Sequence, residues 1–312
     1  MSNSDTKLEK AIKDVVNYFN YFSYPPDAVE LHKYLSLKIT KSLLQSKLTE
    51  MVNKKELIES NDPKILNTRY FILNTNTIPP ERIDSMIRHD RAVYSKNKLK
   101  KIKKLISILS VFPQIQLVGL SGSITMNFAA KHDDVDLFVI SSNGRIWTAR
   151  LICIIISTFF GLRRSRGAQK VSDQVCLNMF FDHTGLAIHK SKQNLYTGHE
   201  VLQMKPIINK QDTYNKFINA NNWVFDYFPN ASNTLRHSGK ERSDATRISL
   251  LNKFFLSIVG IMNTGGNTIE YCAKKMQLTL INKHKTSEYI TNTQLWFHPE
   301  DFEKKLRRDK II

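Results

Sequence analysis

Apolar and polar positions along the first seventy residues follow three helical patterns and then two short strand-like patterns. Apolar residues recur every three or four positions over residues 7–21, and Ser-Tyr-Pro-Pro at 23–26 ends this pattern. Asp27, with Glu30 three residues later, has the form of a capping box that begins a second helix. The pattern predicts helices over residues 7–21, 27–35 and 40–52 and strands over residues 56–59 and 69–73.

Three short helices followed by two strands are the plan of a winged helix, and we expect such a module over residues 1–78. Its third helix carries Lys41 and Lys47, where a recognition helix would place phosphate contacts. Winged helices also serve as protein-docking modules, and lysines on a helix often form only its solvated face. Contact with nucleic acid and a purely structural role therefore both remain open for this module.

A polar helical pattern over residues 79–110 contains six lysines within nine residues. Apolar residues continue through this run at a spacing of three and four, which places the lysines on the outer face of an amphipathic helix. Such a charge cluster attracts a polyanion, so RNA or DNA is an expected partner, with a merely solvated face as the alternative. The six residues are Lys96, Lys98, Lys100, Lys101, Lys103 and Lys104.

Short strands separated by polar turns follow this helix. A first strand is predicted to end at the turn Gly122-Ser123, which opens a helical segment. A second strand begins with Asp134-Val-Asp136, and a third covers residues 174–181. This order predicts a small mixed sheet flanked by helices.

Asp134 and Asp136 lie two positions apart at the start of a strand, so their carboxylates point to the same face. Two like charges this close are costly unless a cation lies between them. Mg²⁺ and Mn²⁺ prefer oxygen ligands, so the pair predicts a divalent metal site. A surface turn whose acids simply begin a strand is the alternative.

The Gly-Ser turn offers a second kind of contact. Gly122 and Ser123 stand at the head of the predicted helical segment, where backbone N–H groups, a hydroxyl and the helix dipole favour a phosphate. Together with Asp134 and Asp136, they could hold a metal-bound nucleoside triphosphate for phosphoryl transfer.

A Gly-Ser turn, ten intervening residues and an Asp-x-Asp strand resemble the signature of the polymerase β-like nucleotidyltransferase superfamily. The chain is also similar to a bacterial group in which a winged-helix-like N-terminus precedes such a nucleotidyltransferase domain. This resemblance covers residues 10–230 and implies a domain type without a settled substrate. The segments that carry it are residues 24–25, 121–123, 134–138, 144–150, 176–179, 196–206 and 220–223.

The superfamily supplies a third carboxylate from a later strand, and Asn178 occupies the expected position here. Strict alternation along that strand places Cys176, Asn178 and Phe180 on one face. An amide oxygen can bind Mg²⁺, but an amide cannot accept the proton of an attacking hydroxyl. Asp173 and Asp182 flank the strand and are the alternative acids. The resemblance thus leaves open a slow enzyme, an enzyme whose acceptor needs no deprotonation, or a nucleotide-binding protein without catalysis.

Arginines after the Asp-x-Asp strand could add phosphate contacts, because a guanidinium pairs with phosphate through two hydrogen bonds. Arg145 and Arg150 are the expected nucleotide-binding residues. Arg163, Arg164 and Arg166 form a second basic cluster, for which surface charge at a helix C-terminus is the alternative.

His199 and Glu200 lie together in a further predicted helix and could line the acceptor side of the site. A buried, hydrogen-bonded histidine is the alternative for His199.

The apolar run at residues 151–162 predicts a buried helix, because its 12 residues are fewer than the roughly 20 that span a bilayer. The first residues, MSNSDTKLEK, lack the apolar stretch of a signal peptide, so we expect a cytoplasmic protein without a membrane partner. Three scattered cysteines exclude a disulfide framework. Further predicted features are a polar linker over 231–245, helices over 248–262 and 268–280, and a basic tail over 304–310.

Composition supports a globular protein with an anionic partner. Hydrophobic residues make up 41% and charged residues 24%, which suffices for a buried core. The net charge is +18, and its surplus is spread along the whole chain. Nucleic acid or nucleotide phosphates are the expected partners, and improved solubility is the alternative explanation.

We therefore expect an α+β chain of four parts: a winged-helix-like module (1–78), a basic amphipathic connecting helix (79–110), a nucleotidyltransferase domain (111–230) and a helical C-terminal region (231–312). The implied activity is Mg²⁺- or Mn²⁺-dependent transfer of a nucleoside monophosphate from a nucleoside triphosphate, with ATP expected, to RNA, protein or a small molecule. A catalytically weak nucleotide sensor that binds nucleic acid or protein is the alternative. The expected residues are Asp134, Asp136 and Asn178 for catalysis, Asp134 and Asp136 for the metal, and Gly122, Ser123, Arg145 and Arg150 for the nucleotide.

Overall fold

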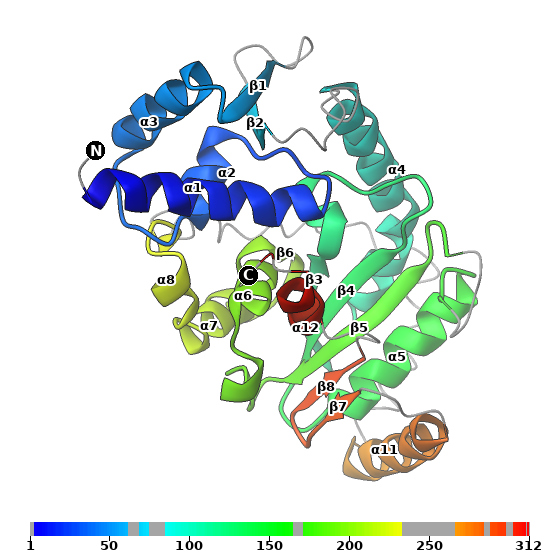
Figure 1. Cartoon of the computed structure of the whole chain (residues 1–312). Coiled ribbons are helices and arrows are strands. Elements are labelled where there is room, and N and C mark those ends of the chain that lie inside the picture. The colour runs from blue at the N-terminus through cyan, green and yellow to red at the C-terminus, as the bar shows by residue number, and fades with distance from the viewer. Residues whose placement is uncertain are drawn as a thin grey trace.

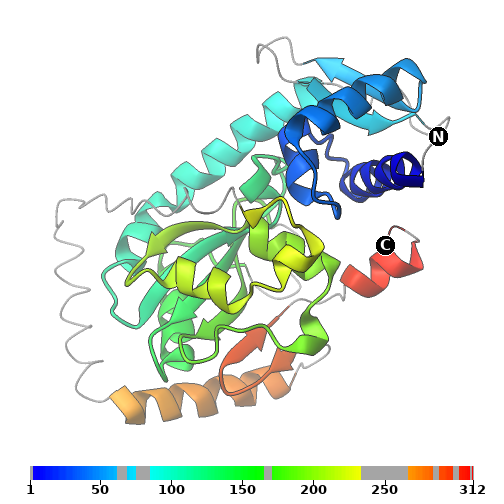
Figure 2. The same cartoon turned by 90° about the vertical axis from the view of Figure 1, so that its left-hand side faces the viewer.

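The computed structural model describes residues 3–61, 69–74, 85–164, 171–232, 266–283, 288–297, 302–309 and 311. It has an α+β fold in which helices lie on both faces of a six-stranded mixed sheet (Figure 1). The N-terminal helices and a separate two-stranded sheet stand at one end of this body, and a long helix runs from them along the sheet (Figure 2). The prediction of a mixed sheet flanked by helices is confirmed.

All five predicted N-terminal elements are present. The capping box forms as expected, because Asp27 Oδ1 accepts from Glu30 N at 2.8 Å and Glu30 Oε2 accepts from Asp27 N at 2.9 Å. The two strands pair in antiparallel fashion. The elements are α1 (Asn3–Tyr21), α2 (Ala28–Tyr34), α3 (Lys41–Asn53), β1 (Leu57–Asn61) and β2 (Arg69–Leu73).

Lys47 on α3 does not offer the phosphate contact considered for it. Its side chain is only 3% exposed, and its ammonium lies 2.6 Å from Asp5, 2.9 Å from Glu9 and 3.0 Å from Glu50. The three carboxylates balance its charge within the module, so Lys47 ties α3 to α1. Lys41 remains exposed.

The strands of the main sheet come from two distant parts of the chain. They lie in the order β6-β3-β4-β5-β8-β7, and only the β4–β5 pair is parallel. This parallel pair needs a crossover, which helix α5 (Ile146–Phe159) supplies. The three predicted strands correspond to β3, β4 and β5. The six strands are β3 (Ile115–Ser121), β4 (Val135–Ser141), β5 (Val175–Asp182), β6 (Lys205–Asn209), β7 (Tyr289–Ile290) and β8 (Gln294–Trp296).

Each face of the sheet buries its own set of helices. Helix α5 packs on one face with α4 (Ser85–Leu109) and α11 (Gly266–Asn282). On α5, Ile155 and Phe159 stay exposed, so the helix predicted over 151–162 is buried along one side only. The opposite face carries α1 and the short helices α6 (Leu195–Gln203), α7 (Thr213–Ala220), α8 (Val224–Tyr227) and α12 (Phe302–Arg308).

The C-terminal region was predicted to be helical, and this prediction is corrected in part. Strands β7 and β8 from this region extend the main sheet beyond β5. Helix α11 confirms the helix predicted over 268–280. The predicted linker beyond residue 232, the helix predicted over 248–262 and Arg166 lie outside the described residues.

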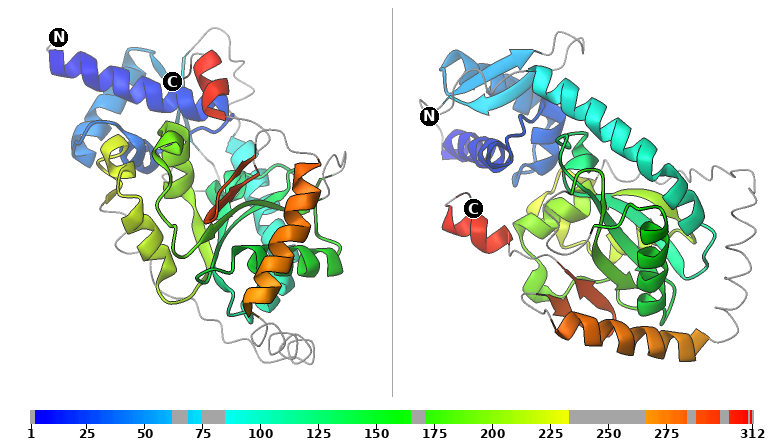
Figure 3. Two further views of the ribbon diagram at one scale, coloured as in Figure 1. Left: turned by 90° about the horizontal axis from the view of Figure 1, so that it is seen from below. Right: turned by 90° about the vertical axis from the view of Figure 1, so that its right-hand side faces the viewer.

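One hydrophobic cluster is continuous between the N-terminal helices and the sheet. The rings of Tyr18 on α1 and His199 on α6 stack with their centres 3.9 Å apart. Helix α12 joins the same cluster, and Tyr21 OH donates to Asp309 Oδ2 at 2.9 Å beside it (Figure 3). The predicted parts at residues 1–78 and 111–230 therefore share a core.

Across the described ranges, no helix is both long enough and apolar enough to cross a membrane.

Five of the six lysines in the basic run face solvent from α4, but Lys98 does not. Lys98 is 1% exposed, and its Nζ donates to Asp133 O at 2.6 Å, to Lys131 O at 3.1 Å and to Asp173 Oδ1 at 3.0 Å. The expectation that Lys98 contacts nucleic acid is therefore corrected. Lys101 stays half-exposed, although it also pairs with Asp173.

Replacement of Lys98 tests its structural role. Lys98→Met would leave two backbone carbonyls and Asp173 without their buried donor, so we expect a loss of about 2–4 kcal/mol in the free energy of unfolding. Urea unfolding measures this, with Lys100→Met on the exposed side of α4 as the matched control, expected to change by less than about 0.5 kcal/mol. Equal effects of the two substitutions would contradict this role for Lys98.

Candidate functional site

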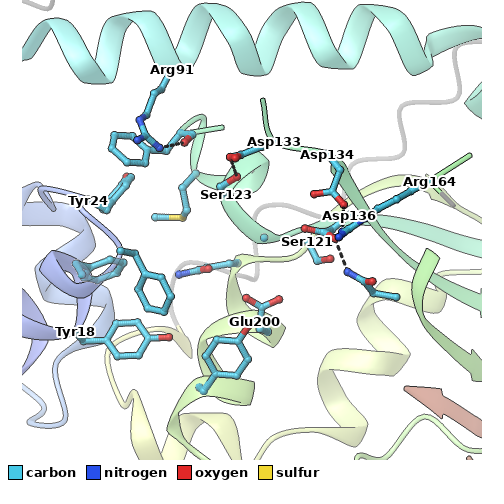
Figure 4. A pocket seen from close by; sticks show the side chains of 18 residues that line it. Tyr18, Tyr24, Arg91, Ser121, Ser123, Asp133, Asp134, Asp136, Arg164 and Glu200 are labelled. Carbon is cyan, nitrogen blue, oxygen red and sulfur yellow. Dashed lines mark hydrogen bonds and ion pairs between the residues drawn. The ribbon is translucent and has the colours of Figure 1, made fainter. Parts of the chain in front are cut away.

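A cavity of about 620 Å³ opens between the N-terminal helices and the sheet, and its volume lies within the range of small-molecule sites (Figure 4). Polar and charged side chains form one side of this cavity, where Figure 4 labels Asp134, Asp136 and Arg164. Aromatic rings form the other side. These rings belong to Tyr18, Phe19, Phe22, Tyr24, Phe128 and Tyr196.

Asp134 and Asp136 reach the cavity from the start of β4, as their spacing predicts. In the sheet, Asp136 lies between Ser121 of β3 and Cys176 of β5. Arg164 Nη1 donates to Asp134 Oδ2 at 2.5 Å, so a guanidinium balances this carboxylate. The ligand atoms of Asp134, Asp136 and Cys176 lie within 4.8 Å of one another, close enough to hold one metal ion.

The surroundings of the Asp136 carboxyl do not fully balance its charged form. Burial raises its pKa from 3.8 to about 8, and the carboxylates of Asp134 and Glu200 add to the rise. Arg164 and the hydrogen bond from Asn178 oppose the rise without cancelling it. A divalent cation would provide the missing positive charge, so the donor set fits such an ion.

Asn178 meets Asp136 because β5 contains a β-bulge. The register with β4 shifts between Leu177 and Met179, which makes Asn178 an extra residue. Its Nδ2 donates to Asp136 Oδ1, and its Oδ1 accepts from Cys176 Sγ at 2.7 Å. Burial raises the pKa of Cys176 to about 12, so this group is a neutral thiol donor.

The same bulge overturns the predicted alternation of side chains along β5. Met179 and Phe181 pack in the core on the cavity side, whereas Phe180 packs beneath α5 on the opposite face. Phe180 therefore does not share the face of Asn178, because the extra residue reverses the alternation after it.

The absence of a side chain at Gly122 allows the backbone of the turn to lie close to the Asp136 carboxylate. The φ of Gly122 is +67°, and a Cβ at this position would lie 2.7 Å from Asp136 Oδ2. The predicted helical segment is the short 3-10 helix Gly122–Met126, so the dipole that it offers to a phosphate is smaller than that of an α-helix of several turns. Ser123 Oγ remains at the cavity and donates to Asp133 Oδ2 at 3.1 Å.

Glu200 provides a fourth carboxylate at the cavity, from helix α6, after Asp133, Asp134 and Asp136. Burial raises its pKa to about 7, while a hydrogen bond from the Gly122 backbone N–H opposes the rise. The neighbouring His199 does not line the cavity and is 2% exposed among aromatic rings. It is buried as the alternative expected, but its Nδ1 has no hydrogen-bond partner among the described residues. Only the packing of α6 against the Gly-Ser turn brings Glu200 near Asp136, so sequence spacing could not assign it to the acidic group.

Arg145 and Arg150 lie at the wrong face of the sheet for the role expected of them. Both belong to the α5 segment, which packs on the face opposite the cavity. Arg150 Nη1 donates to Gln277 Oε1 at 2.5 Å and its guanidinium lies 4.4 Å from the centre of the Phe297 ring. The guanidinium groups that line the cavity are those of Arg164, from the second basic cluster, and of Arg91 on α4 beside Tyr24.

The two alternative acids serve the scaffold. Asp173 pairs with Lys98 and Lys101 of α4. Asp182 is 2% exposed and accepts from Thr184 N at 3.0 Å and from Arg145 N at 3.2 Å. Neither lines the cavity.

No protein-family model, curated protein or solved structure matches this chain.

Two glycines with the same backbone conformation test the close approach at the turn. Gly144 has φ +63° with nothing within 4 Å of a Cβ, whereas a Cβ at Gly122 would meet Asp136. We expect Gly122→Ala to lower the free energy of unfolding by about 1–3 kcal/mol more than Gly144→Ala, because both suffer backbone strain and only the first is overpacked. Urea unfolding measures the difference, and equal losses would refute the close approach.

The raised pKa of Asp136 predicts a pH dependence of stability. Between pH 3.8 and about 8 the folded chain keeps a proton on Asp136 that the unfolded chain releases, so stability falls as the pH rises through this interval. An asparagine at position 136 cannot titrate. The difference in stability between the Asp136→Asn variant and the wild type should therefore shift in favour of the variant from about pH 5 to about pH 8. Thermal unfolding across this range checks the prediction, and Mn²⁺ should stabilise only the wild type. Parallel pH curves for the two proteins would count against it.

Proposed function

We propose that this protein is a nucleotidyltransferase of the polymerase β-like type that transfers a nucleoside monophosphate from a nucleoside triphosphate to an acceptor hydroxyl. One observation carries the proposal: a single cavity joins a paired-aspartate wall to an aromatic wall. A nucleoside triphosphate has the same division, because its phosphates are charged and its base is a flat ring system. The Gly-Ser turn beside the acids agrees with the superfamily resemblance.

Asp134 and Asp136 would hold Mg²⁺ or Mn²⁺, and the amide oxygen of Asn178 is the next available oxygen ligand. When bound, the ion would neutralise the charge that develops on the transferring phosphate. Cys176 is not expected to contribute, because a neutral thiol is a poor ligand for a hard cation.

The chain's own residues would orient the nucleotide across the cavity. Arg164 and Ser123 lie at the polar wall, where a guanidinium and a hydroxyl can bind phosphate oxygens. Tyr18 and Tyr24 lie at the aromatic wall, where a base can stack. Stacking does not select among bases, so ATP remains an expectation.

Glu200 supports catalysis despite the amide at position 178. In the transfer, the acceptor oxygen bonds to the α-phosphorus, the bond from this phosphorus to the bridging oxygen breaks, and pyrophosphate leaves. The proton of the acceptor hydroxyl goes to the Glu200 carboxylate, whose pKa of about 7 suits a base at neutral pH. Asn178 then needs only to hold Asp136 in place.

The order of α1–α3, β1 and β2 agrees with a winged helix, and the five exposed lysines of α4 agree with a nucleic-acid partner. RNA, protein and a small molecule are all acceptors in this proposal. The alternative function, a nucleotide sensor without catalysis, is favoured by Asn178 alone.

Label transfer tests the proposal. The purified protein is incubated with each α-labelled nucleoside triphosphate, Mg²⁺ or Mn²⁺, and a cell extract separated into RNA, protein and small-molecule fractions. We expect label in one fraction, its loss in Asp134→Ala/Asp136→Ala, and a decrease of about 10²–10⁴ in Glu200→Gln. Asp226→Asn, an exposed acid on α8, is the matched control and should transfer normally.

If no fraction is labelled but the protein still binds nucleotide in a metal-dependent way, the transferase proposal is wrong and the nucleotide sensor is the function that fits. Full activity in Glu200→Gln would show that Glu200 is not the base. The metal-binding role of the two acids of β4 would be unaffected by that result.

A further inference from the structure

A second pocket, of about 360 Å³, lies on the other side of the Gly122–Met126 turn. Residues of α2, α4, α6 and β6 line it, so it is built by both the N-terminal helices and the sheet domain. Met126 and Gln203 line this pocket and the larger cavity, so the two spaces are neighbours. We call it the basic pocket, after its three cationic residues Lys33, Arg88 and Lys205.

The basic pocket contains more positive charge than its own groups balance. Glu30 is the single carboxylate among its lining residues. This carboxylate accepts hydrogen bonds from Tyr24 OH and from Asp27 N, and lies 3.5 Å from Arg88 Nη1. Glu30 is thus committed to partners other than the two lysines.

Lys33 is held in the pocket by a neutral group. Its Nζ donates to Leu202 O at 3.0 Å, and no acidic oxygen of the described residues lies within ion-pair distance. Burial lowers its pKa to about 8, Glu30 opposes this change, and the Lys205 ammonium adds to it. Lys205 lines the pocket with its side chain exposed, and its partial desolvation there lowers its pKa. Lys33 is half-buried and has no acidic partner among the described residues, so an anion that enters the pocket would pair with both lysines.

We propose that the basic pocket binds a phosphate group of the acceptor substrate through Lys33 and Lys205. The assignment of this ligand as the acceptor substrate rests on the proposed function, in which the neighbouring cavity binds the nucleotide. A phosphate fits better than a carboxylate, since its larger negative charge can pair with both lysines of the pocket. The guanidinium of Arg88 is already held by Glu30, Pro25 O and Tyr24 OH. The substrate class is therefore a phosphorylated molecule whose hydroxyl reaches past Met126 and Gln203 toward Glu200.

Binding of inorganic phosphate to the whole chain tests the pocket directly. Isothermal titration calorimetry compares the wild type with Lys33→Gln/Lys205→Gln, for which we expect affinity to fall by at least about tenfold. Lys216→Gln, an exposed lysine on α7 outside the pocket, is the matched control and should bind like the wild type.

Unchanged affinity in the double variant, an equal loss in Lys216→Gln, or no binding by the wild type would each overturn the inference. If the double variant fails to fold, the single variant Lys205→Gln takes its place, because this exposed side chain can be replaced without disturbing the core. It should lower phosphate affinity by about tenfold by itself.

Two further probes identify the source of the phosphate. Ribose 5-phosphate is compared with ribose, and a 5′-phosphorylated RNA oligonucleotide with its 5′-hydroxyl form. The phosphorylated member of at least one pair should bind more tightly in a Lys33- and Lys205-dependent way, and no preference in either pair would contradict an acceptor phosphate. Phosphate binding requires no nucleotide, so failed label transfer would overturn the proposed function alone, and unchanged phosphate affinity would overturn the pocket alone.

Discussion

Two carboxylates that point into one buried cavity form the constraint around which the candidate site is arranged. Arg164 forms an ion pair with Asp134, whereas Asp136 receives a hydrogen bond from the Asn178 amide and lies against the turn at Gly122. Gly122 leaves room for this second carboxylate, and the bulge at Asn178 delivers a donor to it. The neighbouring groups therefore limit the repulsion without removing it, which is the condition in which a bound cation stabilises a protein most.

Short-range patterns predicted the elements that lie close together in sequence. The capping box at Asp27, the strands β3 to β5 and the shared face of Asp134 and Asp136 depend on periodicity and on spacings of two or three residues. Such features are set by local backbone geometry, and the structure reproduces them. The predicted alternation of side chains along β5 is wrong after Asn178, because no sequence pattern in an apolar strand indicates a single extra residue.

Features that depend on packing between distant segments could not be predicted. Glu200 was expected to line the site, but its place beside Asp136, 64 positions earlier in the chain, depends on the docking of α6. Lys98 is one of six similar lysines, and its burial depends on the position of the Asp133 loop. Arg145 was expected at the nucleotide because it follows the Asp strand, yet the crossover takes it to the other face of the sheet.

The sheet order has a consequence for synthesis of the protein. Strand β5 pairs on one side with β4 and on the other with β8, whose residues are translated more than one hundred positions later. Until the ribosome passes Trp296, β5 is an open edge with unpaired backbone groups. A nascent chain at that stage therefore exposes the strand that carries Asn178, and chaperone binding there would protect it from pairing with another chain.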